Sequence, residues 1–325
     1  MRTQHRGVAL ITALLIVAAA GIMSASIVYW HLASLSRTSN LLAVAQLREY
    51  QHGLDQWAIS ILRRDARETS YDHSGEPWSA PIPPIVIPEG QLGGRLSDLN
   101  GRFNINALIR TDGQVDEVML ARLRRLLATL NLNPLLADAI ADWVDEDSTP
   151  RRDGAEDNVY LRRTPAYRAA NQAMRHISEL RSVAGVNDAV FAQLAPFVAA
   201  LPQGTSINVN TAPNEVLMSL DDAFSRSLAE SLGENGRRSF SNLDEFTEHP
   251  GVLLLALTPD KLAGLSTQSQ FFLAEAVVDI NDVVARFETI YRRQGQTVTR
   301  MWSWPAPIQM PPLDDPAATG YASPQ

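Results

Sequence analysis

Two helical patterns of hydrophobic residues follow each other at the start of the chain. The run from Val8 to Trp30 holds no charged residue, and its roughly 23 residues suffice to span about 30 Å of membrane hydrocarbon as a helix. A stripe of apolar residues then recurs at steps of three and four, the spacing of one helix face: Leu47, Tyr50, Leu54, Trp57 and Ile61. We therefore predict one helix from Val8 to about Ala66, about 90 Å long. The stripe packs either against a domain of the same chain or against other helices in a coiled coil.

The middle of the chain is predicted to be helical. Proline and glycine are frequent from Tyr71 to Gly94, so the first helix has ended there. We interpret Gly94 to Ile105 as an extended segment. Helix-spaced apolar residues then define four further segments, Val115–Leu130, Pro134–Val144, Asn187–Leu201 and Pro213–Leu220.

Near the C-terminus the hydrophobic period changes to two. Apolar residues alternate with more polar ones from Phe272 to Ile280, and two further extended segments, Ala285–Tyr291 and Val298–Trp304, are separated by Gln294-Gly295. This pattern predicts a three-stranded antiparallel meander with one face available for the helical stripe. Sheet elements therefore flank a helical block, which indicates an α+β fold with an inserted all-α domain.

Two short segments with alternating asparagines resemble each other. They are Phe103-Asn104-Ile105-Asn106-Ala107 and Ile207-Asn208-Val209-Asn210-Thr211-Ala212-Pro213. Asn210 and Thr211 are good capping residues, and Pro213 suits a first helical turn. We interpret both segments as short extended pieces that end at a helix start, and not as a ligand site.

The N-terminal apolar run has the charge pattern of a membrane anchor. Arg2 and Arg6 precede it and no basic residue follows until Arg37, so the positive-inside rule places the N-terminus in the cytoplasm. A cleaved signal peptide, cut near Ala18-Ala19-Ala20, is the alternative reading.

The junction Gly7-Val8-Ala9-Leu10-Ile11-Thr12 resembles the leaders that prepilin peptidase cuts. This resemblance implies cleavage after Gly7, N-methylation of Val8 and retention of the apolar helix. Pilin-like proteins usually carry glutamate at the fifth mature position, where this chain has Thr12.

Composition narrows the classes of function. Apolar residues make up 45% and charged residues 20% of the 325 residues, as in a globular protein. The net charge is −8, and it becomes −10 when Arg2 and Arg6 leave with the leader. This acidity disfavours nucleic acid as a partner. The absence of cysteine excludes disulfides, thiolate nucleophiles and cysteine-ligated zinc.

An acidic loop from Asp142 to Asp157 carries the most distinctive chemistry. Seven carboxylates and two arginines fall within these sixteen residues. Crowded carboxylates suit Ca²⁺, which takes six to eight oxygen ligands in flexible geometry. Asp145 and Asp147 lie two residues apart, and a turn at Gly154 could return Glu156 and Asp157 toward them. The loop is no EF-hand, and composition alone leaves a solvated acidic loop as the alternative.

We find no pattern typical of an enzyme. The six histidines are scattered, and no nucleophile elbow, phosphate-binding loop or dinucleotide fingerprint occurs. A membrane-anchored periplasmic enzyme of unrecognised type remains an alternative hypothesis. A competence-type nucleic-acid binder is another, because Val183-Ala184-Gly185-Val186 could form a helix-hairpin-helix turn.

Four motifs in order resemble the K-type minor pseudopilins of type II secretion systems. They are the leader Arg6-Gly7-Val8, the segment Leu99-Asn100-Gly101-Arg102-Phe103-Asn104-Ile105-Asn106, the Asp142-Trp143 loop ending Gly154-Ala155-Glu156-Asp157, and Ile207-Asn208-Val209-Asn210-Thr211-Ala212-Pro213. The resemblance implies a pilin-like fold, a long helix packed on an antiparallel sheet. It also implies that the insertion consists of sterile-alpha-motif-like (SAM-like) or helix-hairpin-helix-like units.

This family assignment divides the chain into six parts. They are the leader (1–7), the transmembrane and assembly helix (8–70), a first β part (71–110), the helical insertion with its acidic loop (111–266), the C-terminal strands (267–308) and a flexible tail (309–325).

The resemblance also implies a metal site, a location and partners. Calcium would be bound by Asp145, Asp147, Glu156 and Asp157, with Asp142 and a backbone carbonyl as lesser candidates. The protein would sit in the inner membrane with its bulk in the periplasm, at the tip of the pseudopilus. Its partners would be I-type and J-type minor pseudopilins, with the H-type and major pseudopilins reached through them. Contacts with secreted substrates or the outer-membrane secretin are further options; nucleic acid is not expected.

Overall fold

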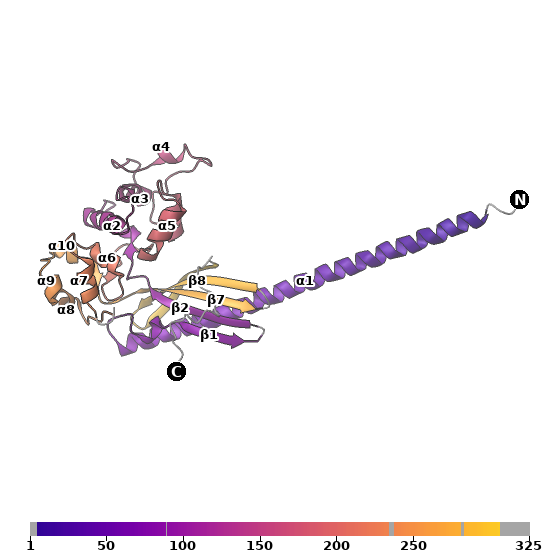
Figure 1. Ribbon diagram of the computed structural model, residues 1–325, viewed down its shortest axis with the longest axis horizontal. Helices are drawn as coiled ribbons and strands as arrows, with labels where there is room; N and C mark the ends of the chain where they lie inside the picture. The colour runs from indigo at the N-terminus through magenta and orange to yellow at the C-terminus, as the bar shows by residue number, and fades with distance from the viewer. Residues whose placement is uncertain (1–4, 89, 234–236, 281–282, 306–325) are drawn as a thin grey trace.

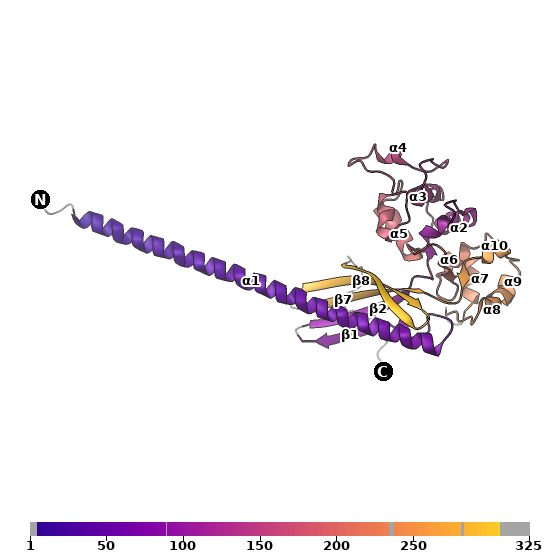
Figure 2. The same ribbon diagram turned by 180° about the vertical axis from the view of Figure 1, so that it is seen from behind.

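The protein consists of a long helix, a twisted sheet packed on its second half, and a helical block beyond the sheet (Figure 1, Figure 2). The computed structural model describes residues 5–88, 90–233, 237–280 and 283–305. The predicted tail, 309–325, lies outside these residues. Helix α1 runs from His5 to Glu68 and is about 96 Å long at 1.5 Å per residue.

The two halves of α1 have different surroundings. Within the first half, Leu10–Leu35 is long and apolar enough to cross a membrane, and its side chains are exposed. In the second half, the predicted stripe packs against the sheet of the same chain, with Leu47 touching Val278 and Ile280. Toward the end of the helix the deepest burial shifts by one residue, from the predicted Trp57 and Ile61, which are half-buried, to Ala58 and Leu62. The intramolecular reading of the stripe is therefore confirmed.

The sheet has five strands in the order β1-β2-β7-β8-β9, and all neighbours are antiparallel. The predicted C-terminal meander is confirmed as β7, β8 and β9. Residues 272, 274, 276, 278 and 280 of β7 alternate onto the face toward α1, which is the period-two signal of the sequence. The strands are β1 (Ile82–Ile87), β2 (Gly90–Asp98), β7 (Phe271–Ile280), β8 (Val283–Gln294) and β9 (Thr297–Pro305).

No local pattern in the sequence predicted strand β1, although the family resemblance placed a β part over residues 71–110. It lies in the proline-rich stretch and contains Pro83 and Pro84. Proline cannot donate a ladder hydrogen bond, so it is tolerated in strands mainly at a sheet edge. β1 is an edge strand, bonded only to β2, and a register irregularity falls between Ile82 and Ile85.

The helical block is an insertion between two paired strands. β2 and β7 are bonded along their whole length, from Gly90 opposite Ile280 to Asp98 opposite Phe272. The insertion contains the largest core of the described residues. Its helices are α2 (Glu117–Thr129), α3 (Leu136–Val144), α4 (Asp157–Tyr160), α5 (Asp188–Leu194), α6 (Asn214–Met218), α7 (Arg226–Ser231), α8 (Leu243–Glu248), α9 (Pro250–Leu253) and α10 (Pro259–Leu262), with 3-10 turns Ile105–Leu108, Ile177–Ser182 and Ala195–Phe197; a further 3-10 turn, Pro77–Ser79, precedes the sheet.

Two details of the insertion differ from the sequence prediction. Phe103, Ile105 and Leu108 pack in its core, so it begins soon after Asp98 and not at residue 111. The helix predicted over Asn187–Leu201 ends at Leu194. Pro196 cannot continue an α-helix, and the chain turns into a short strand.

The insertion also contains two short parallel strand pairs, so it is not purely helical. β3 (Phe103–Asn104) pairs with β4 (Val198–Ala199), and β5 (Ile207–Asn208) pairs with β6 (Leu265–Ser266). The first pair joins the two ends of residues 103–199, and the second pair joins the two ends of residues 207–266. The insertion therefore consists of two modules, which we name module 1 (residues 103–199) and module 2 (residues 207–266).

The side chains of the alternating asparagines join distant backbone segments within each module. In module 1, the Asn106 side chain donates to the carbonyls of Met174 and Leu201, both at 2.9 Å, and accepts from the Met174 amide. In module 2, Asn210 exchanges two hydrogen bonds with the backbone of Phe240. Both segments are thus short extended pieces that lead toward a helix start, as predicted, but neither Asn210 nor Thr211 caps α6, because Pro213 occupies its N-cap without a side-chain hydrogen bond.

Candidate metal centre

The acidic loop begins where α3 ends. Asp142 in the last turn of α3 is fully buried, and its carboxylate accepts from the Arg151 amide at 3.0 Å. A Cβ at Gly154 would lie 1.8 Å from Asp142 Oδ2, so only glycine fits there. The carboxylate of Asp142 and the small size of Gly154 thus fold the loop back on itself.

This turn brings three carboxylates together. Oxygens of Asp145, Asp147 and Glu156 all lie within 4.8 Å of one another, and we name these residues the open cluster. Asp145 is only 4% exposed and Glu156 only 2% exposed, whereas Asp147 is exposed. Among the described residues, no hydrogen-bond partner exists for Asp145 Oδ1 or for either carboxylate oxygen of Glu156. Buried acceptors without a donor are rare in native proteins and indicate that something else supplies one.

The electrostatics of the open cluster disfavour its charged form in the absence of a cation. Burial raises the pKa of Asp145 to about 7, and the carboxylates of Asp147, Asp142 and Glu156 add to this. Burial likewise raises the pKa of Glu156 to about 7; the carboxylates of Asp142, Asp147 and Asp157 add to this, and the nearby side-chain amide of Asn171 opposes it. No arginine or lysine forms an ion pair with Asp145, Asp147 or Glu156 in the part of the chain that the structure describes.

The other two predicted ligands have partners of their own. Asp142 accepts backbone hydrogen bonds, and burial raises its pKa to about 6. Asp157 begins α4; its Oδ1 accepts from the Ala169 amide at 3.0 Å, and its Oδ2 lies 3.2 Å from an Arg168 nitrogen. The structure therefore places Asp142 and Asp157 at the border of the open cluster.

The sequence reasoning missed Asn171. Its side chain donates to the backbone carbonyl of Asp147, while its Oδ1 is buried and lacks a partner among the described residues. Its backbone is in the left-handed region, at φ 45°, which asparagine tolerates better than most residues. An amide oxygen is a normal calcium ligand. Nothing in the sequence could have indicated it, because Asn171 lies outside the acidic run.

Three aromatic side chains pack against one another beside the acidic loop. Trp143 meets the Tyr160 ring edge to face at 5.1 Å, and Tyr160 stacks on Tyr167 at 5.4 Å. The Tyr167 hydroxyl donates to the carbonyl of Ser182 at 2.7 Å. The end of α3 and the whole of α4 are thereby fixed to the same core, so the open cluster rests on rigid elements.

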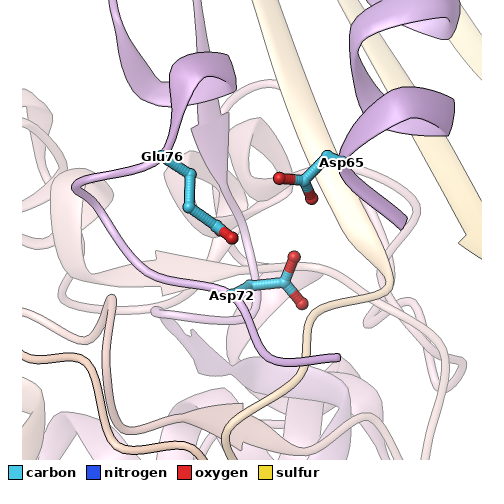
Figure 3. Close-up of side chains that lie close together, drawn as sticks. All are labelled: Asp65, Asp72 and Glu76. Carbon is cyan, nitrogen blue, oxygen red and sulfur yellow. The ribbon is translucent and has the colours of Figure 1, made fainter. Parts of the chain in front are cut away.

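A second carboxylate cluster lies where α1 ends: Asp65 is on the helix, and Asp72 and Glu76 are on the chain that follows it (Figure 3). Asp65, Asp72 and Glu76 also bring their oxygens within 4.8 Å of one another, and all three are buried. This group contains its own cation: Arg293 on β8 bonds Asp65 at 2.6 Å and also bonds Asp72. Glu76 accepts from Trp78 Nε1 at 2.8 Å. We name these three carboxylates with Arg293 the closed cluster.

The chemistry of the open cluster suits a hard divalent cation. Three carboxylates and an amide oxygen converge here. The Thr149 amide donates to Asp147 Oδ1 at 2.6 Å, but Asp145 Oδ1, both Glu156 oxygens and Asn171 Oδ1 have no donor among the described residues. Oxygen ligands of this kind are those that Ca²⁺ prefers. The closed cluster is unsuited to a metal, because its acceptors already have donors from Arg293 and Trp78.

Comparison with known proteins places the chain in a family. Family models described as "Type II secretion system (T2SS), protein K" match residues 101–203 and 207–268. The type II secretion system protein K of Pseudomonas aeruginosa is 38% identical over 77% of this chain and 78% of its own length. The chain belongs to the protein K family of type II secretion systems. It is thus a minor pseudopilin, as its sequence motifs indicated.

Further relatives agree along nearly the whole length. The protein K of Pectobacterium carotovorum is 31% identical over 92% of this chain and 95% of its own. A solved GspK-GspI-GspJ complex from the type 2 secretion system of enterotoxigenic Escherichia coli matches with a TM-score of 0.74 and 26% identity, covering 83% of this chain and 99% of that one. This match confirms the N-terminal helix and the antiparallel sheet. The two family models also fall on the two modules.

Proposed function

We propose that this chain caps the tip of a pseudopilus, bound to I-type and J-type minor pseudopilins. The observation that carries the proposal is the position of the insertion: it lies beyond the sheet, at the end of the molecule opposite the N-terminus of α1 (Figure 1). A subunit stacked further along the same axis would meet the two modules. The GspK-GspI-GspJ title of the similar structure supports the choice of partners.

The tip position is tested by labelling isolated pseudopili. An epitope inserted after Gly113, in an exposed turn with nothing within 4 Å of the position of a Cβ, should leave the fold intact. Immunogold particles are expected only at filament ends. Particles spaced along the shaft would show that the chain is a shaft subunit. Coexpression with the I-type and J-type proteins should yield a ternary complex on size exclusion.

The membrane topology belongs to the same proposal. Leu10–Leu35 would span the inner membrane, with the N-terminus in the cytoplasm and the sheet and modules in the periplasm. Prepilin peptidase would cut after Gly7 and the new N-terminus at Val8 would be methylated. Mass spectrometry of the mature N-terminus tests this: methylated Val8 is the expected result, and a start near Gly21 or Ser26 would indicate a cleaved signal peptide instead.

We further propose that the open cluster binds calcium and thereby fixes the acidic loop. The buried, donor-free oxygens of Asp145 and Glu156 support this, and Asp147 and Asn171 can complete the set. Asp142 would orient the loop backbone, and Asp157 would position the start of α4. When bound, the ion would supply the positive charge that this site otherwise lacks.

Calorimetric titration of calcium-free full chain with Ca²⁺ tests the metal site. Saturable binding is expected for the wild type. Glu156→Gln should weaken it by about tenfold or more, because a charged ligand is lost. Asp153→Asn is the matched control, since it removes one charge from an exposed position of the same loop outside the cluster. Equal affinity for Glu156→Gln and Asp153→Asn would refute the site.

We also propose that each module is a SAM-like or helix-hairpin-helix-like unit. The turn at Gly185, with φ 83° between buried Val183 and Val186, supports a hairpin of this kind in module 1. The acidity of the chain argues for a protein-binding and not a nucleic-acid-binding use of these units.

A further inference from the structure

Within residues 146–153 of the acidic loop, Arg151 is the only residue that is not exposed. Its side chain is 25% exposed, whereas all its neighbours in this stretch face solvent. Asp145 and Asp147 come before it in the chain, and Glu156 comes after it. Arg151 therefore stands between the two sides of the open cluster, and whatever fixes Arg151 also fixes how these two sides approach each other.

Both the backbone and the side chain of Arg151 are held in place. Its amide donates to the Asp142 carboxylate at 3.0 Å, and its carbonyl accepts from the Gly154 amide at 3.1 Å. Its Nη2 donates to Glu117 Oε1 at 2.7 Å, and its Nε lies 3.4 Å from Asp138 Oδ1. Glu117 is the first residue of α2 and Asp138 lies on α3. One side chain thus ties the acidic loop to two helices of the module 1 core.

The next residue, Arg152, provides an internal comparison. It carries the same charge in the same loop, but it is exposed and its side chain has no hydrogen-bond or ion-pair partner among the described residues. Removal of either arginine takes one positive charge from the loop. Only the removal of Arg151 also takes away the ties to α2 and α3.

We propose that Arg151 is a positioning residue of the metal centre, which holds the acidic loop folded before Ca²⁺ binds. This inference rests on the proposed calcium site. A loop that is already ordered loses less conformational entropy on binding, so the ties of Arg151 should raise the affinity for Ca²⁺. Its charge acts in the opposite direction, because a cation near the open cluster repels Ca²⁺. Positioning and charge therefore predict opposite signs when Arg151 is removed.

Calorimetric titration of the calcium-free full chain in detergent with Ca²⁺ compares two variants of equal charge. Arg151→Gln should weaken Ca²⁺ binding by about tenfold relative to Arg152→Gln, as is typical when a residue that orients metal ligands is lost. Arg152→Gln should bind Ca²⁺ as tightly as the wild type or slightly more tightly. Binding by Arg151→Gln that equals or exceeds binding by Arg152→Gln would overturn the inference.

Hydrogen exchange in the presence of a chelator tests the same inference without the ion. The amides of residue 151 and Gly154 are hydrogen-bonded in the folded loop, and they should lose protection in Arg151→Gln but keep it in Arg152→Gln. Equal protection in the two variants would overturn the role of Arg151. Absence of Ca²⁺ binding in the wild type would be a different result, because it refutes the metal site itself while the exchange data still decide whether Arg151 holds the loop.

A variant on α2 breaks the same contact from the other side. Glu117→Gln changes a side chain that is 66% exposed, so the protein should fold, and it should weaken Ca²⁺ binding and loosen the acidic loop. Since Arg151→Gln already removes the pair, adding Glu117→Gln to it should cause no further loss of affinity. Fully additive losses in the double variant would show that Glu117 acts through its charge and not through Arg151, and would overturn the inference.

Discussion

The open and the closed cluster contain the same kinds of groups and differ in what surrounds them. Each brings three carboxylates within 4.8 Å. In the closed cluster, Arg293 bonds Asp65 and Asp72, and the Ser269 amide also donates to Asp72. Glu76 accepts from Trp78 Nε1, the His73 amide and the Thr69 hydroxyl. In the open cluster, oxygens of Asp145 and Glu156 are buried with no donor among the described residues. The number of carboxylates is equal, so it cannot be what makes a cation site.

The difference lies in where the positive charge comes from. A cluster with an arginine in the fold is complete when the chain folds, and it fastens α1 to β8. A cluster without one depends on an ion from solution, and its stability then follows the concentration of that ion. The stability that the open cluster contributes therefore varies with the concentration of the ion, whereas the contribution of the closed cluster does not.

The largest expected effect comes from removing the cation of the closed cluster. Arg293→Met would leave Asp65 and Asp72 buried and unpaired, which typically costs about 3–5 kcal/mol of unfolding free energy. Denaturant unfolding of the full chain in detergent measures it. Arg64→Met is the control, because the Arg64–Glu68 pair is exposed and exposed pairs contribute little to stability.

A rescue experiment separates lost charge pairing from lost packing. Adding Asp65→Asn and Asp72→Asn to Arg293→Met removes the unpaired charges while keeping the side-chain volumes. Stability should then recover in part. If it does not, packing of the Arg293 side chain over the Phe272 ring explains the loss instead.

Removal of calcium should cause the next largest loss of stability. Chelation should lower the unfolding free energy by about 2.7 kcal/mol relative to a calcium concentration one hundred times the dissociation constant. The Arg293→Met variant should lose the same amount on chelation, because the two clusters share no ion-pair or hydrogen-bond partner among the described residues. Glu156→Gln should lose little. A calcium effect in Glu156→Gln as large as in the wild type would contradict the assignment.

The third effect concerns pH. Burial raises the pKa of Asp145, Glu156 and Asp65 to about 7, against about 4 in an unfolded chain. The folded protein then holds protons that the unfolded chain releases, so calcium-free protein should lose stability as pH rises from about 4 to about 7. Bound calcium keeps Asp145 and Glu156 deprotonated. The stabilisation by calcium should thus grow by about 1 kcal/mol or more between pH 5 and pH 7.

Unfolding curves at each pH, with calcium and with chelator, measure this difference. The contribution of Asp65 is present in both series and cancels. A calcium effect that is constant with pH would show that Asp145 and Glu156 are already charged in the calcium-free protein.

Features formed by residues that are close together in the sequence could be predicted. The long helix and the C-terminal meander followed from local hydrophobic periods. The acidic loop was visible because Asp145, Asp147 and Glu156 lie within twelve residues. Which of these carboxylates would lack a donor was not visible, since that depends on how the chain folds back at Gly154.

Features built from distant residues could not be predicted. The closed cluster joins Asp65 to Arg293, 228 residues apart, and no local pattern links them. Asn171 reaches Asp147 from outside the acidic run for the same reason. Strand β1 was hidden because prolines normally argue against a strand, and only the sheet order shows that it lies at an edge.

The smallest expected effect distinguishes a ligand from a neighbour within the acidic loop. Asp157→Asn keeps an oxygen that can accept from the Ala169 amide, and it loses only the exposed pairing with Arg168. The unfolding free energy should change by less than about 0.5 kcal/mol, and calcium affinity by only a few fold. Asp147→Asn should weaken calcium binding more, because Asp147 lies in the cluster itself. Calorimetric titration of both variants decides between them: if Asp157→Asn loses more affinity than Asp147→Asn, the Asp157 carboxylate must leave Ala169 and Arg168 when the ion binds.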